Sequence, residues 1–166
     1  YEDFVKKGYV KEAIVNYIAL LGWSPKSNVE KMSLAELTAN FSLDGISKSP
    51  SIFDENKMKW LSGEYIKEMT KEEFKSRAYS FLKTSKAFGK YDEDKLLDLA
   101  KGRVQIFSEI PEKIDFLEEF CAYDINLFEN QKQKASVEVA KSVIPEIVSC
   151  LEGVADWNNS SLFSAL

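Results

Sequence analysis

Apolar residues recur every three or four positions along most of this 166-residue chain, which is the spacing of one helix face. The same spacing continues over 54–69, 70–82, 92–107, 108–121 and 131–152. In the clearest case, the segment 10–21, the apolar positions are Val10, Ala13, Ile14, Tyr17, Ile18 and Leu21. The sequence therefore predicts an all-α fold.

Helix-start signals support these segments. The runs Ser33-Leu34-Ala35-Glu36 and Thr70-Lys71-Glu72-Glu73 are capping-box patterns, in which the first and fourth side chains each accept a backbone N–H. Asp54 and Asp92 are the expected N-cap residues of the helices that follow them. Pro145 falls inside the last long segment and is expected to kink or split it, because proline lacks the donor of an interior helix position.

The rare residues exclude several kinds of chemistry. The chain has no histidine, and its two cysteines, Cys121 and Cys150, lie far apart in helix-like surroundings. A zinc site of the usual Cys/His kind and histidine-based acid–base catalysis are therefore excluded within the chain. We predict no metal ligand, no catalytic residue and two reduced, mostly buried thiols.

Nothing in the sequence points to a membrane or to export. No apolar run approaches the roughly 20 residues of a membrane span. The N-terminus, Tyr1-Glu2-Asp3-Phe4, has neither an initiator methionine nor a basic-then-apolar signal pattern. We expect a cytoplasmic protein without membrane contact and, given the missing methionine, a fragment of a longer chain.

The net charge of −5 conceals an asymmetry along the chain. Residues 1–67 carry 9 Lys/Arg and 9 Asp/Glu, residues 68–107 carry 9 and 7, and residues 108–166 carry 4 and 11. Phosphate neutralisation requires local positive charge and not a positive total. Contacts with an anionic partner are therefore expected in the first two segments.

One run of residues is more specific than the rest. It reads Ser47-Lys48-Ser49-Pro50-Ser51-Ile52-Phe53-Asp54, then Lys57-Met58-Lys59-Trp60-Leu61 and Gly63-Glu64-Tyr65-Ile66. This run resembles the segment with which bacterial glutamyl-tRNA synthetases enter their anticodon-binding region. The family pattern there is roughly SKSP-x-x-FD-x-x-KL-x-WLN-x-x-YI, with Met58 here for the usual Leu and Ser62 for the usual Asn.

A second block strengthens the resemblance. Gly8-Tyr9-Val10 and then residues 12–25 are similar to the family's GYLPEAIVNYLALLGWS stretch. Both motifs stand in the family's order and spacing, and the resemblance extends to about Tyr123. It implies an elongated helical bundle of the class I aminoacyl-tRNA synthetase anticodon-binding, α-helix-cage type. Residues 1–67 would form the stem-contact region and entry helix, 68–152 the first anticodon-binding bundle, and 153–166 the start of a truncated second subdomain.

The resemblance also implies a function. The chain would be the tRNA-binding fragment of a glutamate–tRNA ligase, whose parent enzyme attaches glutamate to its tRNA using ATP and Mg²⁺. The ATP-holding HIGH-like and KMSKS-like motifs are absent from these residues and would belong to a catalytic domain N-terminal to Tyr1. The fragment alone is therefore expected to bind glutamate-accepting tRNA as a monomer, without catalysis, cofactor or DNA binding.

The first candidate site residues lie on the helix that Asp54 would begin, where positions 57, 60, 64 and 67 share a face. Lysine can contact phosphate, and an indole offers a flat apolar surface to an unstacked base. From the residues alone, a buried Trp60 with solvated lysines is the more common arrangement. The resemblance instead implies that Lys57, Trp60 and Lys67 lie beside the anticodon stem and loop, with Lys67 where relatives often carry arginine.

The resemblance implies two further contacts. Arg103 matches a helical arginine that approaches the last anticodon base in the family, and a guanidinium can both hydrogen-bond and stack on a base. The alternative is a surface arginine paired with Asp98 or Glu109. The extended loop that contains Ser47, Lys48 and Ser49 could bind phosphate or ribose through its hydroxyl and amide groups, or could be only a capped turn between domains.

A rival interpretation keeps the synthetase signature but not the RNA contacts. The net charge of −7 over residues 108–166 would suit a helical protein-interaction module better than an RNA-binding one. The two interpretations differ in where the cations point: an RNA-binding chain should place Lys57, Lys67 and Arg103 on one side.

Overall fold

The computed structural model describes residues 1–27, 29–119 and 122–166, and within them the only regular elements are helices, apart from two isolated β-bridges. The predicted all-α fold is confirmed. The chain divides into two compact units, Tyr1–Phe120 and Cys121–Leu166. This division differs from the domain boundaries expected at 67/68 and 152/153, which stay predictions.

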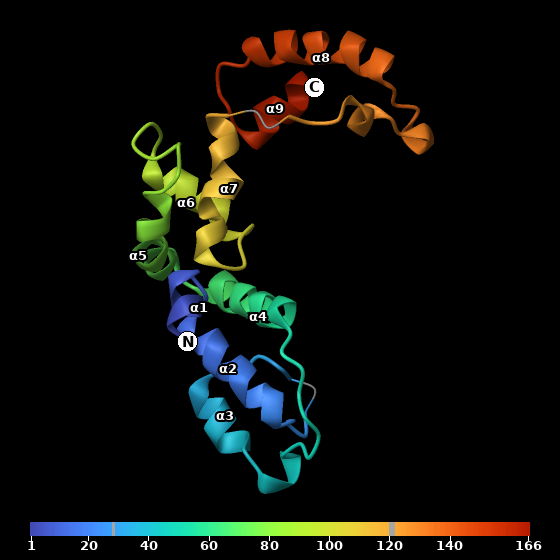
Figure 1. The fold of residues 1–166 in the computed structure, drawn as a ribbon. Helices are drawn as coiled ribbons and strands as arrows, with labels where there is room; N and C mark the ends of the chain where they lie inside the picture. The colour runs from blue at the N-terminus through green and yellow to red at the C-terminus, as the bar shows by residue number, and fades with distance from the viewer. Residues whose placement is uncertain (28, 120–121) are drawn as a thin grey trace. The chain divides into compact units, whose positions relative to one another are not determined.

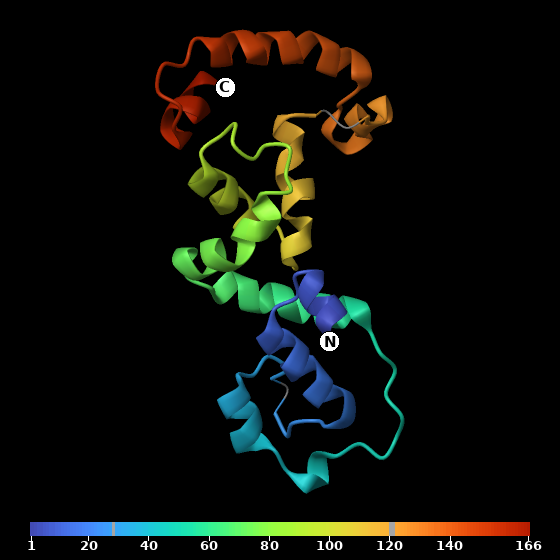
Figure 2. The same ribbon diagram turned by 60° about the vertical axis from the view of Figure 1, so that its left-hand side comes forward.

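The first unit begins with α1 (Glu2–Lys6), α2 (Lys11–Gly22), α3 (Leu34–Asn40), the 3₁₀ turn η1 (Leu43–Gly45) and α4 (Glu55–Glu68). α4 lies between α2 and α3 on one side and α5 to α7 on the other (Figures 1 and 2). The predicted caps are present: the Ser33–Glu36 capping box opens α3, and the Asp54 carboxylate accepts the Asn56 and Lys57 amides at 2.9 and 3.1 Å.

The rest of the first unit is a small helix bundle. It consists of α5 (Lys71–Leu82), α6 (Glu93–Lys101), η2 (Phe107–Glu109), α7 (Ile110–Ile114) and η3 (Asp115–Leu117). The main apolar core draws on residues from Tyr9 to Ile114, a smaller cluster contains Trp23, Met32 and Leu37, and the main core includes the fully buried side chains Ile14, Met58, Leu61, Ile66, Phe74, Leu82 and Ile110. Burial of such side chains is the main stabilising contribution to this unit.

Two predicted helices are shorter than their periodicity indicated. The helix expected over 92–107 ends at Lys101, because Gly102 forms its C-cap and the amides of Gln105 and Ile106 bond to the Glu109 carboxylate instead. The helix expected over 108–121 is replaced by η2, α7 and η3, and its last residue, Cys121, lies outside the described residues.

A close contact joins the start of the first unit to its far end. The Phe107 amide donates to the Gly8 carbonyl oxygen at 3.0 Å. Gly8 has a φ of +83°, and a Cβ there would lie 2.9 Å from both the Phe107 and Ser108 nitrogens. Nearby, the Arg77 guanidinium forms a two-pronged ion pair with Glu12 at 3.0 and 3.1 Å. Residues about 100 positions apart along the chain are thus held backbone to backbone.

A buried polar network fixes the loop after α2. Asn16 is fully buried; its amide group donates to the Glu30 carbonyl oxygen at 2.9 Å and accepts from the Met32 amide at 2.8 Å. The Tyr65 hydroxyl donates to the Met32 carbonyl oxygen at 2.6 Å. Asn16 therefore links α2, this loop and α4 through buried hydrogen bonds.

The second unit contains η4 (Ile125–Phe128), η5 (Gln131–Gln133), α8 (Val137–Glu152) and α9 (Asn159–Ala165). None of its described side chains is buried. α8 continues through Pro145 without being split, contrary to one of the two expected outcomes. Cys150 is a free thiol, as predicted, but it is exposed, because no described element covers that side of α8. No helix in the described ranges is long and apolar enough to cross a membrane.

Candidate nucleic-acid interface

α4 separates an apolar face from a polar one. Met58 and Leu61 are each 1% exposed, whereas Trp60 is 40% exposed and Lys67 is also exposed. The helix is held in this orientation by its Asp54 cap and by the Ser62 hydroxyl, which accepts the Val10 amide at 3.1 Å. Trp60 is therefore a surface residue and not part of the core, so its indole is accessible to a ligand.

The lysines of α4 all have carboxylate neighbours. Lys57 pairs with Glu30 at 2.6 Å, and Lys59 pairs with Glu109 at 2.5 Å. Lys67 pairs within the helix with Glu64 at 2.5 Å, so the face shared by 57, 60, 64 and 67 carries both signs of charge. The Lys57–Glu30 and Lys67–Glu64 pairs are solvent-accessible, and such pairs contribute about 1 kcal/mol or less, so a phosphate can replace the carboxylate.

Arg103 lies in the turn after α6 and not on a helix, which corrects the helical position expected for it. Neither alternative partner is used, since Asp98 pairs with Lys71 and Glu109 with Lys59. Among the residues that the structure describes, none forms a hydrogen bond or ion pair with the exposed Arg103 guanidinium. The other arginine of the chain, Arg77, forms an ion pair with Glu12 through both of its terminal nitrogens.

The turn that carries Arg103 lies against the C-terminal half of α4. On one side of it, the Lys101 ammonium group donates to the Met69 carbonyl oxygen. On the other side of the turn, Gln105 packs against Gly63 of α4: a Cβ added at Gly63 would lie 3.3 Å from the Gln105 Cα. Arg103 is thereby brought to the same end of α4 as Lys67.

The loop with Ser47, Lys48 and Ser49 lies elsewhere. All three residues are exposed, and the Ser47 hydroxyl bonds to the Ser49 backbone, accepting its amide and donating to its carbonyl oxygen at 3.2 Å. The Ser47 amide donates to Gly22, at the C-terminal end of α2, whereas the N-terminal end of α2 meets Ser62. The loop is thus about 18 Å, the length of α2, from the part of α4 near Arg103.

Along the length of α4 the predicted residues therefore form two groups. Trp60, Lys67 and Arg103 lie around the middle and C-terminal half of α4, while Lys57 and the seryl loop lie toward its N-terminal end. The carboxylate partners Glu30 and Glu109 were missed from the sequence because they come from distant segments, whereas Glu64, three residues before Lys67, could have been recognised.

Two phenol groups and one carboxyl group that are partly shielded from solvent flank this region. Burial raises the pKa of Tyr65 to about 12 and that of Tyr9 to about 12, so both phenols are neutral donors near neutral pH. Burial acts to raise the pKa of the Glu109 carboxyl, but the hydrogen bonds from Lys59 and the Gln105 amide outweigh it, and the pKa lies below its ordinary value. Glu109 therefore stays ionised and holds the turn after Arg103.

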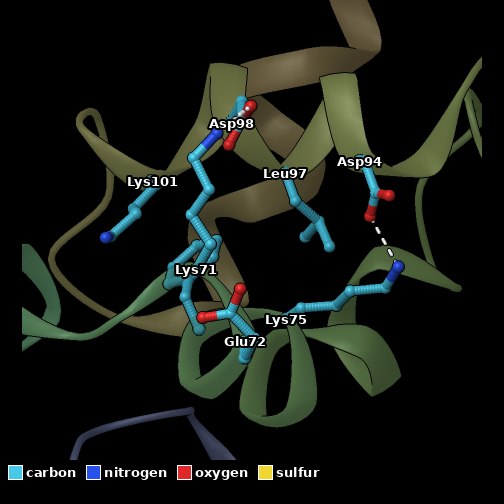
Figure 3. A pocket seen from close by; sticks show the side chains of 8 residues that line it. Lys71, Glu72, Lys75, Asp94, Leu97, Asp98 and Lys101 are labelled. Carbon is cyan, nitrogen blue, oxygen red and sulfur yellow. Dashed lines mark hydrogen bonds and ion pairs between the residues drawn. The ribbon is translucent and has the colours of Figure 1, made fainter.

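A hollow of about 320 Å³ between α5 and α6 was not anticipated from the sequence (Figure 3). Its rim carries three lysines and three acidic residues, with Lys71 paired to Asp98 at 2.7 Å and Lys75 to Asp94 at 2.5 Å. Because these charges cancel, the hollow has no preference for an anion, and we assign it no ligand. Among the described residues, no cluster of His, Cys, Asp or Glu could hold a metal ion.

Family models match both parts of the chain. Residues 55–166 match the model of the anticodon binding domain. Residues 1–60 match the model of the catalytic domain of class I tRNA synthetases (E and Q). The two matches overlap on the first turns of α4, so the segment expected to be a stem-contact region is grouped by this model with the catalytic domain.

Three similar proteins are each longer than this chain. The glutamate–tRNA ligases of Clostridium novyi and Lachnoclostridium phytofermentans are each 41% identical to it, over 98% and 100% of this chain but 34% of their own length. The crystal structure of the glutamate-tRNA synthetase from Elizabethkingia anophelis has a TM-score of 0.71 at 25% identity, covering 98% of this chain and 31% of that one. The chain thus spans about a third of the length of these relatives.

Proposed function

Because the chain belongs to the anticodon-binding domain family, we propose that it binds the anticodon stem and loop of a glutamate-accepting tRNA, as part of a glutamate–tRNA ligase. The match of residues 55–166 to that family carries the proposal. The exposed Trp60 indole and the unpaired Arg103 guanidinium support it, because they are the groups that RNA loops contact by stacking and by base-edge hydrogen bonds.

In this proposal the named residues contact different parts of the tRNA. Lys57 and Lys67 neutralise phosphates, exchanging their exposed carboxylate partners for the RNA backbone. Trp60 supports an unstacked base, and Arg103 reads the edge of the last anticodon base. Ser47, Lys48 and Ser49, at the other end of α2, contact phosphate or ribose further along the stem.

The chemical steps belong to residues outside this chain. In the proposed parent enzyme, ATP and Mg²⁺ activate glutamate, and none of the residues here is assigned to either group. The contribution of this chain is recognition energy: contacts remote from the reacting atoms can orient the acceptor end and so raise kcat as well as lower KM. We also propose that the chain acts in the cytoplasm as a monomer, which light scattering of the purified protein would test.

A titration of the purified chain with two tRNAs tests the proposal. We expect the glutamate tRNA to bind more tightly than the same tRNA mutated at the last anticodon base. Three phosphate contacts predict a log–log salt slope of roughly −2 to −3. Equal affinity for both tRNAs, or affinity that does not change with salt, would contradict anticodon recognition and favour the rival protein-interaction module.

A further inference from the structure

The lysines of the second unit lack the ion pairs that many lysines of the first unit form. Lys132, Lys134 and Lys141 form no ion pair with any described residue, whereas ten of the seventeen lysines of the first unit pair with a carboxylate, as in Lys57–Glu30 and Lys71–Asp98. Residues 122–166 carry these three lysines and six acidic residues. Two of the three lysines are concentrated in one short turn.

This turn, residues 130–135, is closed by its own backbone. The Asn130 amide donates to the Ala135 carbonyl oxygen and the Ala135 amide donates back to Asn130, both at 3.0 Å. The Gln133 amide adds a bond to the Asn130 carbonyl oxygen at 3.1 Å. The four residues of the tip are all exposed: Gln131, Lys132, Gln133 and Lys134.

Lys134 occupies a backbone conformation that does not favour it. Its φ of 54° and ψ of 29° are left-handed, and it is the only non-glycine residue with positive φ in the described ranges. A side chain in that region costs about 1 kcal/mol relative to glycine. A lysine at a position that suits glycine or asparagine is a reason to ask what its ammonium group contributes.

The acidic residue that directly precedes the turn, Glu129, forms no ion pair with the lysines of the tip. The Glu129 carboxylate accepts the Val137 amide at 3.1 Å, at the base of the turn. The tip therefore offers two ammonium and two amide groups, which are hydrogen-bond donors for phosphate and sugar oxygens. It has no aromatic, arginine or aliphatic anchor of the kind that protein interfaces rely on.

We propose that residues 130–135 form a phosphate-binding turn for RNA, in which Lys132 and Lys134 each neutralise a backbone phosphate and Gln131 and Gln133 donate to neighbouring oxygens. This inference rests on the proposed function and extends it to the second unit, where no contact was expected from the charge distribution. Because the backbone bonds already fix the turn, little ordering entropy is lost when RNA binds.

The test is a salt titration of glutamate tRNA with four forms of the whole chain: wild type, the double variant Lys132→Gln/Lys134→Gln, Lys134→Gly, and the control Lys141→Gln. Each phosphate contact should contribute roughly fivefold to affinity at about 0.1 M salt, so the double variant should bind roughly 25-fold more weakly and shallow the slope by about 1.4. Lys134→Gly should lose roughly fivefold although glycine suits this backbone better, which separates the ammonium group from any structural role.

The outcomes separate the two proposals. Wild-type binding with losses confined to the turn variants supports both. Two results would overturn the phosphate-binding turn and leave the proposed function standing. In the first, the turn variants bind as tightly as the wild type. In the second, Lys141→Gln weakens binding as much as each lysine of the turn does. Failure of the wild-type chain to bind tRNA even at low salt overturns the proposed function and this inference with it. A far-UV circular dichroism spectrum of each variant verifies that the helices are retained.

Discussion

In the first unit, carboxylates pair with many of the lysines, and buried apolar side chains form a main core and a smaller second cluster; the described part of the second unit buries no side chain and forms no ion pair. The helices of the second unit are instead fixed by local caps, such as Ser136 and Asn158. Isolated helices of about 15 residues are only marginally stable in water. The difference indicates that the first unit can fold by its own packing, while the second has little packing of its own.

Truncation of one large apolar side chain in each unit should give the largest contrast. Phe74→Ala removes a ring that is 2% exposed and should lower the free energy of unfolding by about 3–5 kcal/mol. Ile144→Ala, at a position 44% exposed on α8, should cost less than about 1 kcal/mol. Urea denaturation followed by circular dichroism measures both values, and similar costs would show that α8 is packed as tightly as α5.

Alanine at two glycines should sharpen the same contrast. Gly8→Ala forces a side chain into a left-handed backbone against the Phe107 nitrogen, so we expect a loss of about 3 kcal/mol. Gly153→Ala, where a Cβ would make an ordinary 3.5 Å contact, should change stability by less than about 0.5 kcal/mol.

The control for Gly8→Ala is Gly89→Ala. Gly89 also has a positive φ, of +75°, but nothing lies within 4 Å of a Cβ there, so only the backbone cost of about 1 kcal/mol should remain. Thermal unfolding of the three variants gives the comparison. Equal losses at Gly8 and Gly89 would mean that the contact with Phe107 contributes nothing.

In the first unit, Arg103 forms no ion pair with a described residue, like the lysines of the second unit, whereas Lys67 pairs with Glu64. Arg103→Ala should weaken binding of the tRNA with the cognate anticodon by about 1–3 kcal/mol. It should also reduce the affinity difference between this tRNA and one mutated at the last anticodon base. Lys67→Ala should weaken both tRNAs alike and shallow the salt slope by less than one. If Arg103→Ala weakens both tRNAs by the same factor, its contact is electrostatic and the base-reading role is wrong.

The smallest expected effect is a loss of folding stability at alkaline pH, and it should originate in the first unit. The folded pKa of Tyr65 and of Tyr9 is about 12, against about 10 in an unfolded chain. Between about pH 10 and 12 the unfolded chain releases protons that the folded chain retains, so stability should fall with rising pH across that window. Tyr65→Phe should make this decline shallower, as measured by urea midpoints from pH 8 to 11. An unchanged slope would show that Tyr65 does not contribute to it.

The sequence predicted best the features that depend only on residues close together along the chain, such as the helix caps. The capping boxes at Ser33 and Thr70 and the Asp54 and Asp92 caps are all present, because each involves residues within one helical turn. The early end of the helix at Lys101 was missed although its C-cap, Gly102, is a helix-stop signal in the sequence; the bonds from the Gln105 and Ile106 amides to Glu109, which lies in the next element, were not predictable from the apolar spacing.

Long-range contacts decided the rest of the candidate site. Ile18 fits the apolar stripe of α2 and yet is 57% exposed, because periodicity identifies a face but not whether a neighbour covers it. The same limit explains the exposed Cys150. That Lys57 is paired and Arg103 unpaired depends on Glu30 and on the final position of the turn, and neither can be read from local spacing.

The Gly8–Phe107 contact has a consequence for how such proteins can be recombined. The family models divide the chain at residues 55–60, but the core and the bonded backbones of Gly8 and Phe107 cross that division. A chimera joined at residue 60 would therefore bring together halves of one interior from two different parents. Exchange between relatives should preserve residues 1–119 as a block, and a crossover after η3 would leave this interior intact.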